Sequence, residues 1–249
     1  MALLSRIFGR DGGARAEPAP VDSSTLAPDA PFVAIGDVHG RLDLLEPRLK
    51  ALEGERVILV GDYVDRGPAS AGVIERLSAL SESDSRVVCL LGNHDQMVRD
   101  FLADPVGAGP LWLTNGGDAT LRSYGLDAFG TETRRRLRDL RDRFAAVLPA
   151  AHLDFFEGLS LAEQLGDFFF CHAGIRPGVP LDEQSPEDLV WIRDEFLSDA
   201  RDHGVVVVHG HTPQSSPEVL PNRINVDTGA VFGGPLTVLA LEGTGYRFL

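Results

Sequence analysis

The stretch RVILVGDYVDRG (residues 56–67) decides the fold class of this chain. Its first part, RVILV, is a β-branched apolar run of the kind that forms a buried strand. Two aspartates, a tyrosine and an arginine follow at once, between residues 62 and 66. Because ligands of α/β sheets bind beyond the carboxyl ends of the strands, charge crowded at this point indicates a binding site.

The same arrangement recurs in both directions along the chain. Other short apolar runs are followed by the polar segments GDVHG (36–40), GNHD (92–95), HAG (172–174), HGHT (209–212) and DTG (227–229). Between the first runs, apolar residues follow helix spacing at 42–52 and 73–80, with Ser70 as the expected N-cap of the second helix. Alternating strands and helices predict an α/β fold with much parallel sheet.

Composition and net charge limit the classes of ligand that the chain can bind. The chain has 249 residues, is 43% hydrophobic and carries a net charge of −14, which suits a globular protein and argues against a surface for nucleic acid or anionic membrane. The basic run RRRLRDLRDR (134–143) has Arg and Asp at i,i+4 spacing, which favours a salt-paired helix face over nucleic-acid binding. Because the chain is acidic, a phosphate-binding site in it needs local positive charge from metal ions or a few arginines.

The ends and the cysteines allow further expectations. Residues 1–30, rich in Gly, Ala, Pro and Ser, are expected to be a disordered tail. We find no signal peptide and no membrane span, so we expect a cytoplasmic protein without a membrane contact. Cys89 and Cys171 lie in apolar runs and are expected to be buried, reduced thiols. The sequence does not indicate an oligomeric state.

The loops after the strands carry six side chains of metal-binding type, namely Asp37, His39, Asp62, Asn93, His172 and His211. Carboxylate, imidazole and amide ligands without thiolate suit Mn, Fe or catalytic Zn better than a structural zinc site. An aspartate between two metals can bridge them, and such a pair can clamp a phosphate and activate a water.

The ordered set GDVHG, GDYVDRG, GNHD, HAG and GHT resembles the signature of the phosphoprotein phosphatase family of dinuclear metallophosphoesterases, in its bacterial and phage-type serine/threonine branch. The resemblance covers essentially residues 32–240. It implies an α/β metallophosphoesterase fold with mixed β-sheets in a β-sandwich, flanked by helices, and an active site at the strand carboxyl ends. It also implies that residues 31–249 form the catalytic domain.

The resemblance assigns the six metal-binding residues to two divalent ions, with Mn²⁺ expected first and Fe or Zn as alternatives. Asp37, His39 and Asp62 would hold the first ion. Asp62 would bridge to the second ion, which Asn93, His172 and His211 would complete. A metal-bridging hydroxide would then attack phosphorus in line.

The resemblance also supplies the catalytic groups. His94 would protonate the leaving oxygen, with Asp65 orienting its ring. Arg66 and Arg193 (in WIRDEF), together with Asn93, would bind the phosphoryl oxygens. General chemistry supports these roles independently. The planar guanidinium of arginine matches the geometry of a phosphate. A leaving alkoxide needs a proton donor, and a carboxylate fixes the tautomer of the histidine that donates the proton.

The expected function is a metal-dependent phosphomonoesterase acting on phosphoproteins, at serine or threonine with tyrosine as a further option, or on small phosphomonoesters. One alternative is a symmetrical dinucleoside tetraphosphate hydrolase, which usually lacks the equivalent of Asp65 and needs aromatic walls for its bases. Five aromatic residues are placed to form such walls, and most have spacings that suggest core positions: Trp112, Tyr124, Phe129, Phe144 and Trp191. The other alternative, a non-catalytic phospho-binding module, requires a broken ligand set, and no ligand is missing.

Four further residues have open roles. Asn115, in LWLTNGGDATLRSYG (111–125), and Arg176, in HAGIRPG (172–178), are candidate substrate contacts on the pocket rim. His209 either lines the site or belongs to the scaffold, and Asp227 is expected to support the ligands rather than to bind metal.

Overall fold

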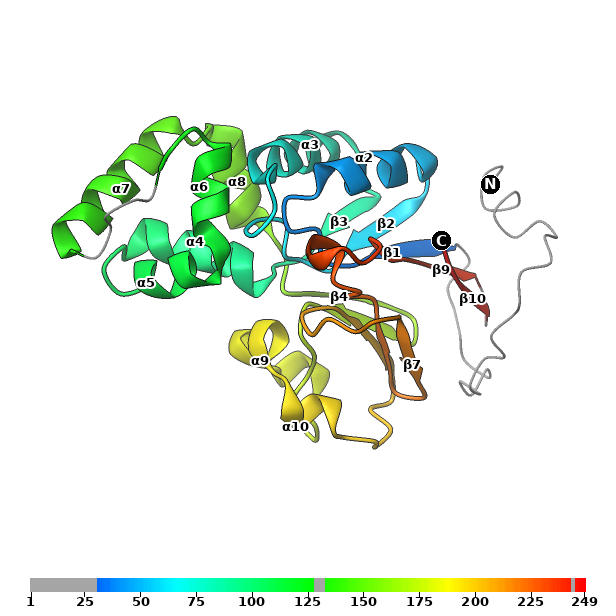
Figure 1. The fold of residues 1–249 in the computed structure, drawn as a ribbon. Coiled ribbons are helices and arrows are strands. Elements are labelled where there is room, and N and C mark those ends of the chain that lie inside the picture. Colours follow the sequence, from blue (N-terminus) through cyan, green and yellow to red (C-terminus); the bar gives the residue numbers. More distant parts are fainter. Residues whose placement is uncertain (1–30, 128–132, 243–244) are drawn as a thin grey trace.

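The computed structural model describes residues 31–127, 133–242 and 245–249, so the expected tail at 1–30 lies outside the described residues. Two five-stranded sheets form the centre of this part of the chain, with helices on their outer faces (Figure 1). Strand–helix alternation correctly predicted an α/β fold. The pairing of strands into two separate mixed sheets was implied by the family resemblance, and the structure confirms it.

The first sheet has the strand order β10-β9-β1-β2-β3. Its strands are β1 (Phe32–Ile35), β2 (Arg56–Leu59), β3 (Val87–Cys89), β9 (Val238–Glu242) and β10 (Gly245–Phe248). The strands β1, β2 and β3 are parallel, whereas β9 pairs antiparallel with both β1 and β10. The carboxyl ends of β1, β2 and β3 therefore lie along one edge.

The second sheet has the order β4-β5-β6-β8-β7. Its strands are β4 (Ala162–Leu165), β5 (Phe168–Cys171), β6 (Val206–His209), β7 (Glu218–Leu220) and β8 (Arg223–Asn225). The central strands β5, β6 and β8 are parallel, and the edge strands β4 and β7 are antiparallel to their neighbours.

The two sheets pack face to face as a β-sandwich. One apolar cluster contains alternate residues of both sheets, among them Ala34, Ile58, Val208 and Ile224. The ring of Phe32 meets Phe168 and Phe170 edge-on, at centroid distances of 5.6 and 5.2 Å, a favoured geometry for aromatic pairs. This dry interface fixes the sheets relative to each other.

Helices cover both outer faces of the sandwich. The helices α2 (Leu42–Ala51) and α3 (Ser70–Ser83) pack on the first sheet, and α9 (Pro186–Trp191) and α10 (Asp194–Leu197) pack on the second (Figure 1). Cys89 and Cys171 are buried free thiols on β3 and β5, as predicted. None of the helices within the described ranges has the length and apolar character needed to cross a membrane.

A group of helices between β3 and β4 extends beyond one end of the sandwich (Figure 1). It comprises α4 (Asn93–Ala103), α5 (Gly109–Trp112), the π-helical turn η1 (Leu113–Gly117), α6 (Asp118–Ser123), α7 (Arg134–Val147) and α8 (Ala150–Gly158). The hydroxyl of Thr133 caps α7 by accepting the backbone N–H of Arg136.

The predicted N-cap of α3 is wrong. Ala69 occupies the N-cap position, and Ser70 is the first residue of the helix. The hydroxyl of Ser70 is buried and accepts the backbone N–H of Asp65 at 3.2 Å. It stabilises the charged loop after β2 rather than the start of its own helix.

Candidate metal centre and active site

The polar loops that follow β1, β2, β3, β5, β6 and β8 converge at one end of the sandwich. The loops therefore come from the parallel strands of both sheets. All six sequence-predicted ligands are buried there: Asp37, His39, Asp62, Asn93, His172 and His211. A fold that buries so many polar side chains together must satisfy them with one another or with a ligand.

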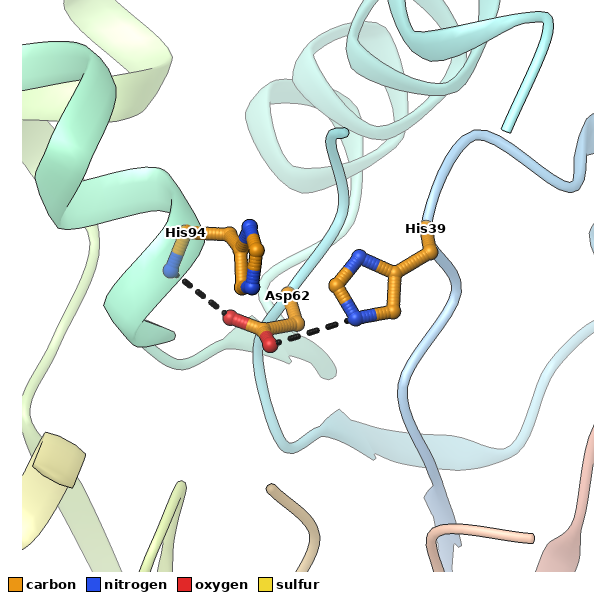
Figure 2. A group of neighbouring side chains, drawn as sticks. All are labelled: His39, Asp62 and His94. Carbon is orange, nitrogen blue, oxygen red and sulfur yellow. Dashed lines mark hydrogen bonds and ion pairs between the residues drawn. The ribbon is translucent and has the colours of Figure 1, made fainter. Parts of the chain in front are cut away.

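Asp62 lies at the centre of this cluster. Its Oδ2 is 3.4 Å from Nε2 of His39, and its Oδ1 is 3.4 Å from Nε2 of His172. Two groups of potential ligand atoms within 4.8 Å of one another share this residue: His39, Asp62 and His94 in one, and Asp62, His172 and His211 in the other. Figure 2 shows the first group, with His39 and the backbone of His94 on the two oxygens of Asp62. Asp62 is thus common to both groups.

Backbone contacts set the tautomers of two histidines. Nδ1 of His39 donates to the carbonyl of Val64 at 2.7 Å, and Nδ1 of His172 donates to the carbonyl of Val60 at 3.0 Å. The lone pair of each ring is therefore on Nε2, which faces Asp62. Fixing a ring in this way is how proteins prepare a histidine to bind a metal.

The second group has a donor set that a cation would satisfy. Nε2 of His172 and Oδ1 of Asn93 are 2.9 Å apart, and both bring lone pairs to the same point. Nδ1 of His211 lies 2.8 Å from the same Oδ1, while its Nε2 is buried without a hydrogen-bond partner. Mutually facing lone pairs and an orphaned buried nitrogen fit a divalent ion.

Asp37 belongs to the cluster but lies outside both compact groups. Its Oδ2 accepts the backbone N–H of His211 at 3.1 Å. Burial raises the pKa of Asp37 well above its usual value, and the charges of Asp227 and Asp62 raise it further. Burial likewise raises the pKa of Asp227 to about 6. Crowded carboxylates of this kind favour a nearby cation.

Two histidines of the cluster, His39 and His211, are neutral near pH 7. Burial lowers the pKa of His39 to about 3 and that of His211 to about 2. A neutral imidazole is the form that binds metals, so no proton has to leave these rings before an ion enters.

His94 and Asp65 form a separate buried pair beside the cluster. Nδ1 of His94 donates to Oδ2 of Asp65 at 2.6 Å. The backbone N–H of His94 donates to Oδ1 of Asp62 at 3.0 Å, which ties the pair to the centre of the site. With Nδ1 committed to Asp65, Nε2 is the ring atom available for proton transfer.

The backbone of these loops is strained. Within the described ranges, every non-glycine residue with positive φ belongs to the candidate site: His39, Asp62, Asp65, Arg66 and His211. Such conformations cost free energy and cluster at functional sites, where the surrounding structure holds them.

Asp95 is one of the groups that hold this backbone, and sequence reasoning assigned it no role. Its fully buried carboxylate accepts the backbone N–H groups of Asp62, Tyr63 and Gly92. Its position three residues after the N-cap of α4 is a capping signal, and that signal could have identified it.

The two candidate phosphate-binding arginines are exposed at the cluster. Nη1 of Arg66 lies 2.7 Å from Nε2 of His39, and its guanidinium lies over the ring of Phe232 at 5.6 Å. Arg193 precedes α10 and donates to the hydroxyl of Thr212, next to His211. Phe232 is 68% exposed, and sequence reasoning did not select it.

The four residues whose roles the sequence left open make different contacts. The guanidinium of Arg176 is engaged by Asp188 through two hydrogen bonds, and the amide of Asn115 donates to the carbonyl of Leu111 in its own helix. His209 is buried against Phe196, at a ring distance of 5.1 Å, and so belongs to the scaffold beneath α10. Asp227 accepts the backbone N–H of Gly229 and shapes the last loop.

Two of the aromatic residues considered as walls for a nucleobase are core residues. Trp112 and Phe144 are fully buried in the core, as their spacing indicated. Trp191 is half-buried and donates to Oε1 of Gln96, and Phe129 lies outside the described residues.

Comparison with known proteins identifies the family. The sequence model of calcineurin-like phosphoesterases matches residues 30–236. The chain belongs to the calcineurin-like phosphoesterase family. Calcineurin-like metallophosphoesterases normally bind two divalent metals, and the two ligand groups around Asp62 are the candidates for that role here.

The relatives within the calcineurin-like family carry two kinds of name. The chain is 31% identical to the bis(5'-nucleosyl)-tetraphosphatase PrpE [asymmetrical] of Anoxybacillus flavithermus, over 82% of this chain and 88% of the relative. It is 29% identical to serine/threonine-protein phosphatase 1 of Salmonella typhimurium, over 84% and 90%. The fold matches the cold-active protein-tyrosine phosphatase of a psychrophilic Shewanella with a TM-score of 0.62 at 17% identity, covering 95% of this chain and 84% of that one. The chain is thus a phosphoesterase of this family, and its branch is a separate question.

Proposed function

We propose that residues 31–249 form a metal-dependent phosphomonoesterase domain that acts on phosphoproteins. The observation that carries this proposal is the buried pair of His94 and Asp65, with Nδ1 and Oδ2 2.6 Å apart, beside the ligand groups around Asp62. A phosphorylated serine or threonine leaves as an alkoxide, which is a poor leaving group. An enzyme for such esters needs a positioned proton donor, and His94 has the required orientation.

Two divalent ions would occupy the cluster. Asp37, His39 and Asp62 would hold one ion, and Asp62 with Asn93, His172 and His211 would hold the other. The set of carboxylate, imidazole and amide ligands favours Mn²⁺, with Fe or Zn as alternatives. Such ions, when bound, neutralise phosphoryl charge and lower the pKa of a water.

The protein side chains would complete the reaction. Arg66 and Arg193, both exposed at the cluster, would bind the phosphoryl oxygens and align the phosphorus. His94 would give the proton on Nε2 to the leaving oxygen as the ester bond breaks. Asp65 would hold the ring and stabilise its charged form.

A second candidate function is the asymmetrical hydrolysis of dinucleoside tetraphosphates. The 31% identical relative bears that name, whereas the sequence had suggested the symmetrical reaction as the alternative. In addition, the exposed ring of Phe232 beside Arg66 is a surface on which a nucleobase could stack.

The deciding experiment compares both substrates on one preparation. Purified protein is given Mn²⁺ at fixed pH with a phosphoserine or phosphothreonine peptide, a phosphotyrosine peptide, an aryl phosphate and diadenosine tetraphosphate. We expect kcat/KM for the best peptide to exceed that for the dinucleotide at least roughly tenfold, about 1.4 kcal/mol in transition-state binding. A higher value for the dinucleotide would make the second candidate correct. The products formed from diadenosine tetraphosphate distinguish asymmetrical from symmetrical hydrolysis. Asymmetrical cleavage yields a nucleoside monophosphate and a nucleoside triphosphate, and symmetrical cleavage yields two nucleoside diphosphates.

A further inference from the structure

The segment 112–120, here called the clamp segment, lies directly against the catalytic loop. It joins the end of α5 to α6 through the π-helical turn η1, and it belongs to the helical group between β3 and β4. The sequence suggested only that this region shapes the pocket rim, yet two of its side chains are fully buried: Trp112 and Thr120.

Both buried side chains of the clamp segment bind Asp65. Nε1 of Trp112 donates to Oδ1 and Oδ2 of Asp65 at 3.0 and 3.1 Å. Oγ1 of Thr120 donates to Oδ1 at 2.6 Å and accepts the backbone N–H of Asp65 at 2.8 Å. Together with His94 on Oδ2, these donors engage both carboxylate oxygens of a residue that is completely buried.

The clamp segment also holds the backbone of Arg66. The carbonyl of Gly116 accepts the backbone N–H of Arg66 at 3.1 Å. Gly116 has φ of 101°, and a Cβ there would lie 2.8 Å from Cγ of Arg66, so glycine is required for this approach. The same nine-residue segment therefore fixes the carboxylate behind His94 and the backbone of a phosphate-binding arginine.

These contacts matter because water cannot replace them. A carboxylate that loses a donor in a buried site keeps an unsatisfied oxygen and can rotate to find another partner. Rotation of Asp65 would move the ring of His94 away from the leaving oxygen. We infer that Trp112 and Thr120 are positioning residues that hold Asp65, and through it His94, for protonation of the leaving group. This inference rests on the proposed function.

The test uses variants that remove one hydrogen-bond donor to the carboxylate of Asp65 and keep an apolar side chain in its place. Thr120→Val replaces the hydroxyl with a methyl group, and Trp112→Phe removes the indole N–H but keeps an aromatic ring. For each, kcat/KM on a phosphoserine peptide should fall roughly tenfold, the usual effect of losing a group that orients a catalytic or metal-binding side chain. The loss on an aryl phosphate with a good leaving group should stay below about threefold, because that substrate needs little protonation.

Three controls separate positioning from general damage. Thr120→Ser keeps the hydroxyl and should restore the phosphoserine rate. Thr114→Val changes an exposed threonine of the same segment, whose hydroxyl donates to the carbonyls of Pro110 and Leu111, and should change neither rate. In an Asp65→Asn background, Thr120→Val should add less than about a twofold further loss, since coupled residues are not additive. Equal losses on both substrates, or additive losses in the double variant, would overturn the inference.

A spectroscopic readout gives an answer that does not depend on turnover. The Nδ1–H proton of His94, in a 2.6 Å hydrogen bond, should give a downfield proton NMR signal that is absent in His94→Asn. Thr120→Val and Trp112→Phe should shift or broaden this signal, and Thr114→Val should not. An unchanged signal in both donor variants would contradict positioning through Asp65. Wild-type turnover of the aryl phosphate tests the proposed function separately, and if there is none, both proposals fall.

Discussion

Three of the proposed ligands are held by a contact with a backbone group. The carbonyls of Val64 and Val60 fix the rings of His39 and His172, and the backbone N–H of His211 fixes the carboxylate of Asp37. These partners are backbone groups of neighbouring loops, so the loops orient one another's side chains. A site held in this way is ordered before a ligand enters, which lowers the free-energy cost of binding.

At this scale the role of His94 gives a first prediction. His94→Asn should lower kcat/KM on phosphoserine roughly 10²–10⁴-fold, because the leaving alkoxide loses its proton donor. The loss should shrink on an aryl phosphate with a good leaving group. Asp65→Asn should show the same dependence on the leaving group with smaller losses. Equal losses on the two substrates would instead mean that His94 binds metal, as its place in one ligand group allows.

The shared position of Asp62 gives a second prediction. Asp62→Asn should remove binding of both ions, whereas His211→Gln should weaken only one, because Asp62 belongs to both ligand groups. Elemental analysis after desalting in the presence of Mn²⁺ should find about two ions per wild-type chain, about one in His211→Gln and fewer in Asp62→Asn. If Asp62→Asn retains as much Mn²⁺ as His211→Gln, the bridging role is wrong.

At the scale of elements, the sequence predicted the six strands that precede the polar loops, because apolar runs and polar motifs alternate locally. It gave no expectation for β4, β7, β9 or β10. It could not predict contacts between distant segments. The Trp112 and Thr120 bonds to Asp65 span 47 and 55 residues, and nothing local to 112–120 indicates them. The same reason explains Ser70: its sequence position suggested a cap, but the approach of the loop after β2 gave its hydroxyl another partner.

Burial within the strands also determines the reactivity of the two cysteines, which gives a third prediction. Burial in β3 raises the pKa of Cys89 to about 12, and burial in β5 raises the pKa of Cys171. Both thiols are therefore largely protonated at pH 8, and we expect neither to react as a nucleophile. A thiol reagent should label neither cysteine in the folded protein and both after denaturation. Rapid labelling of Cys89 or Cys171 in the folded protein would show that its thiol is accessible.

At the scale of the whole molecule, the site joins the two sheets. Asp37, His39, Asp62 and Asn93 follow strands of the first sheet, and His172 and His211 follow strands of the second. The dry sandwich interface sets the distance between these two sets of loops. Glycines permit the close approach where the sheets meet: a Cβ at Gly210, from the second sheet, would overlap the carboxylate of Asp37, from the first.

Because the candidate ligands come from both sheets, metal binding should stabilise the sandwich as a unit, which is the last prediction. An ion present at 1,000 times its Kd adds about 4.1 kcal/mol to the free energy of unfolding. For a domain of this size, about 1 kcal/mol raises Tm by roughly 2–4 °C, so saturating Mn²⁺ should raise Tm by roughly 8–16 °C in calorimetry or circular dichroism.

Chelation should reverse the shift, and Asp62→Asn should remove most of it. His94→Asn is the matched control: if His94 is a proton donor and not a ligand, that variant should keep the full shift. A shift of equal size in Asp62→Asn would place the bound metal elsewhere on the protein, and the two-sheet metal centre would be wrong.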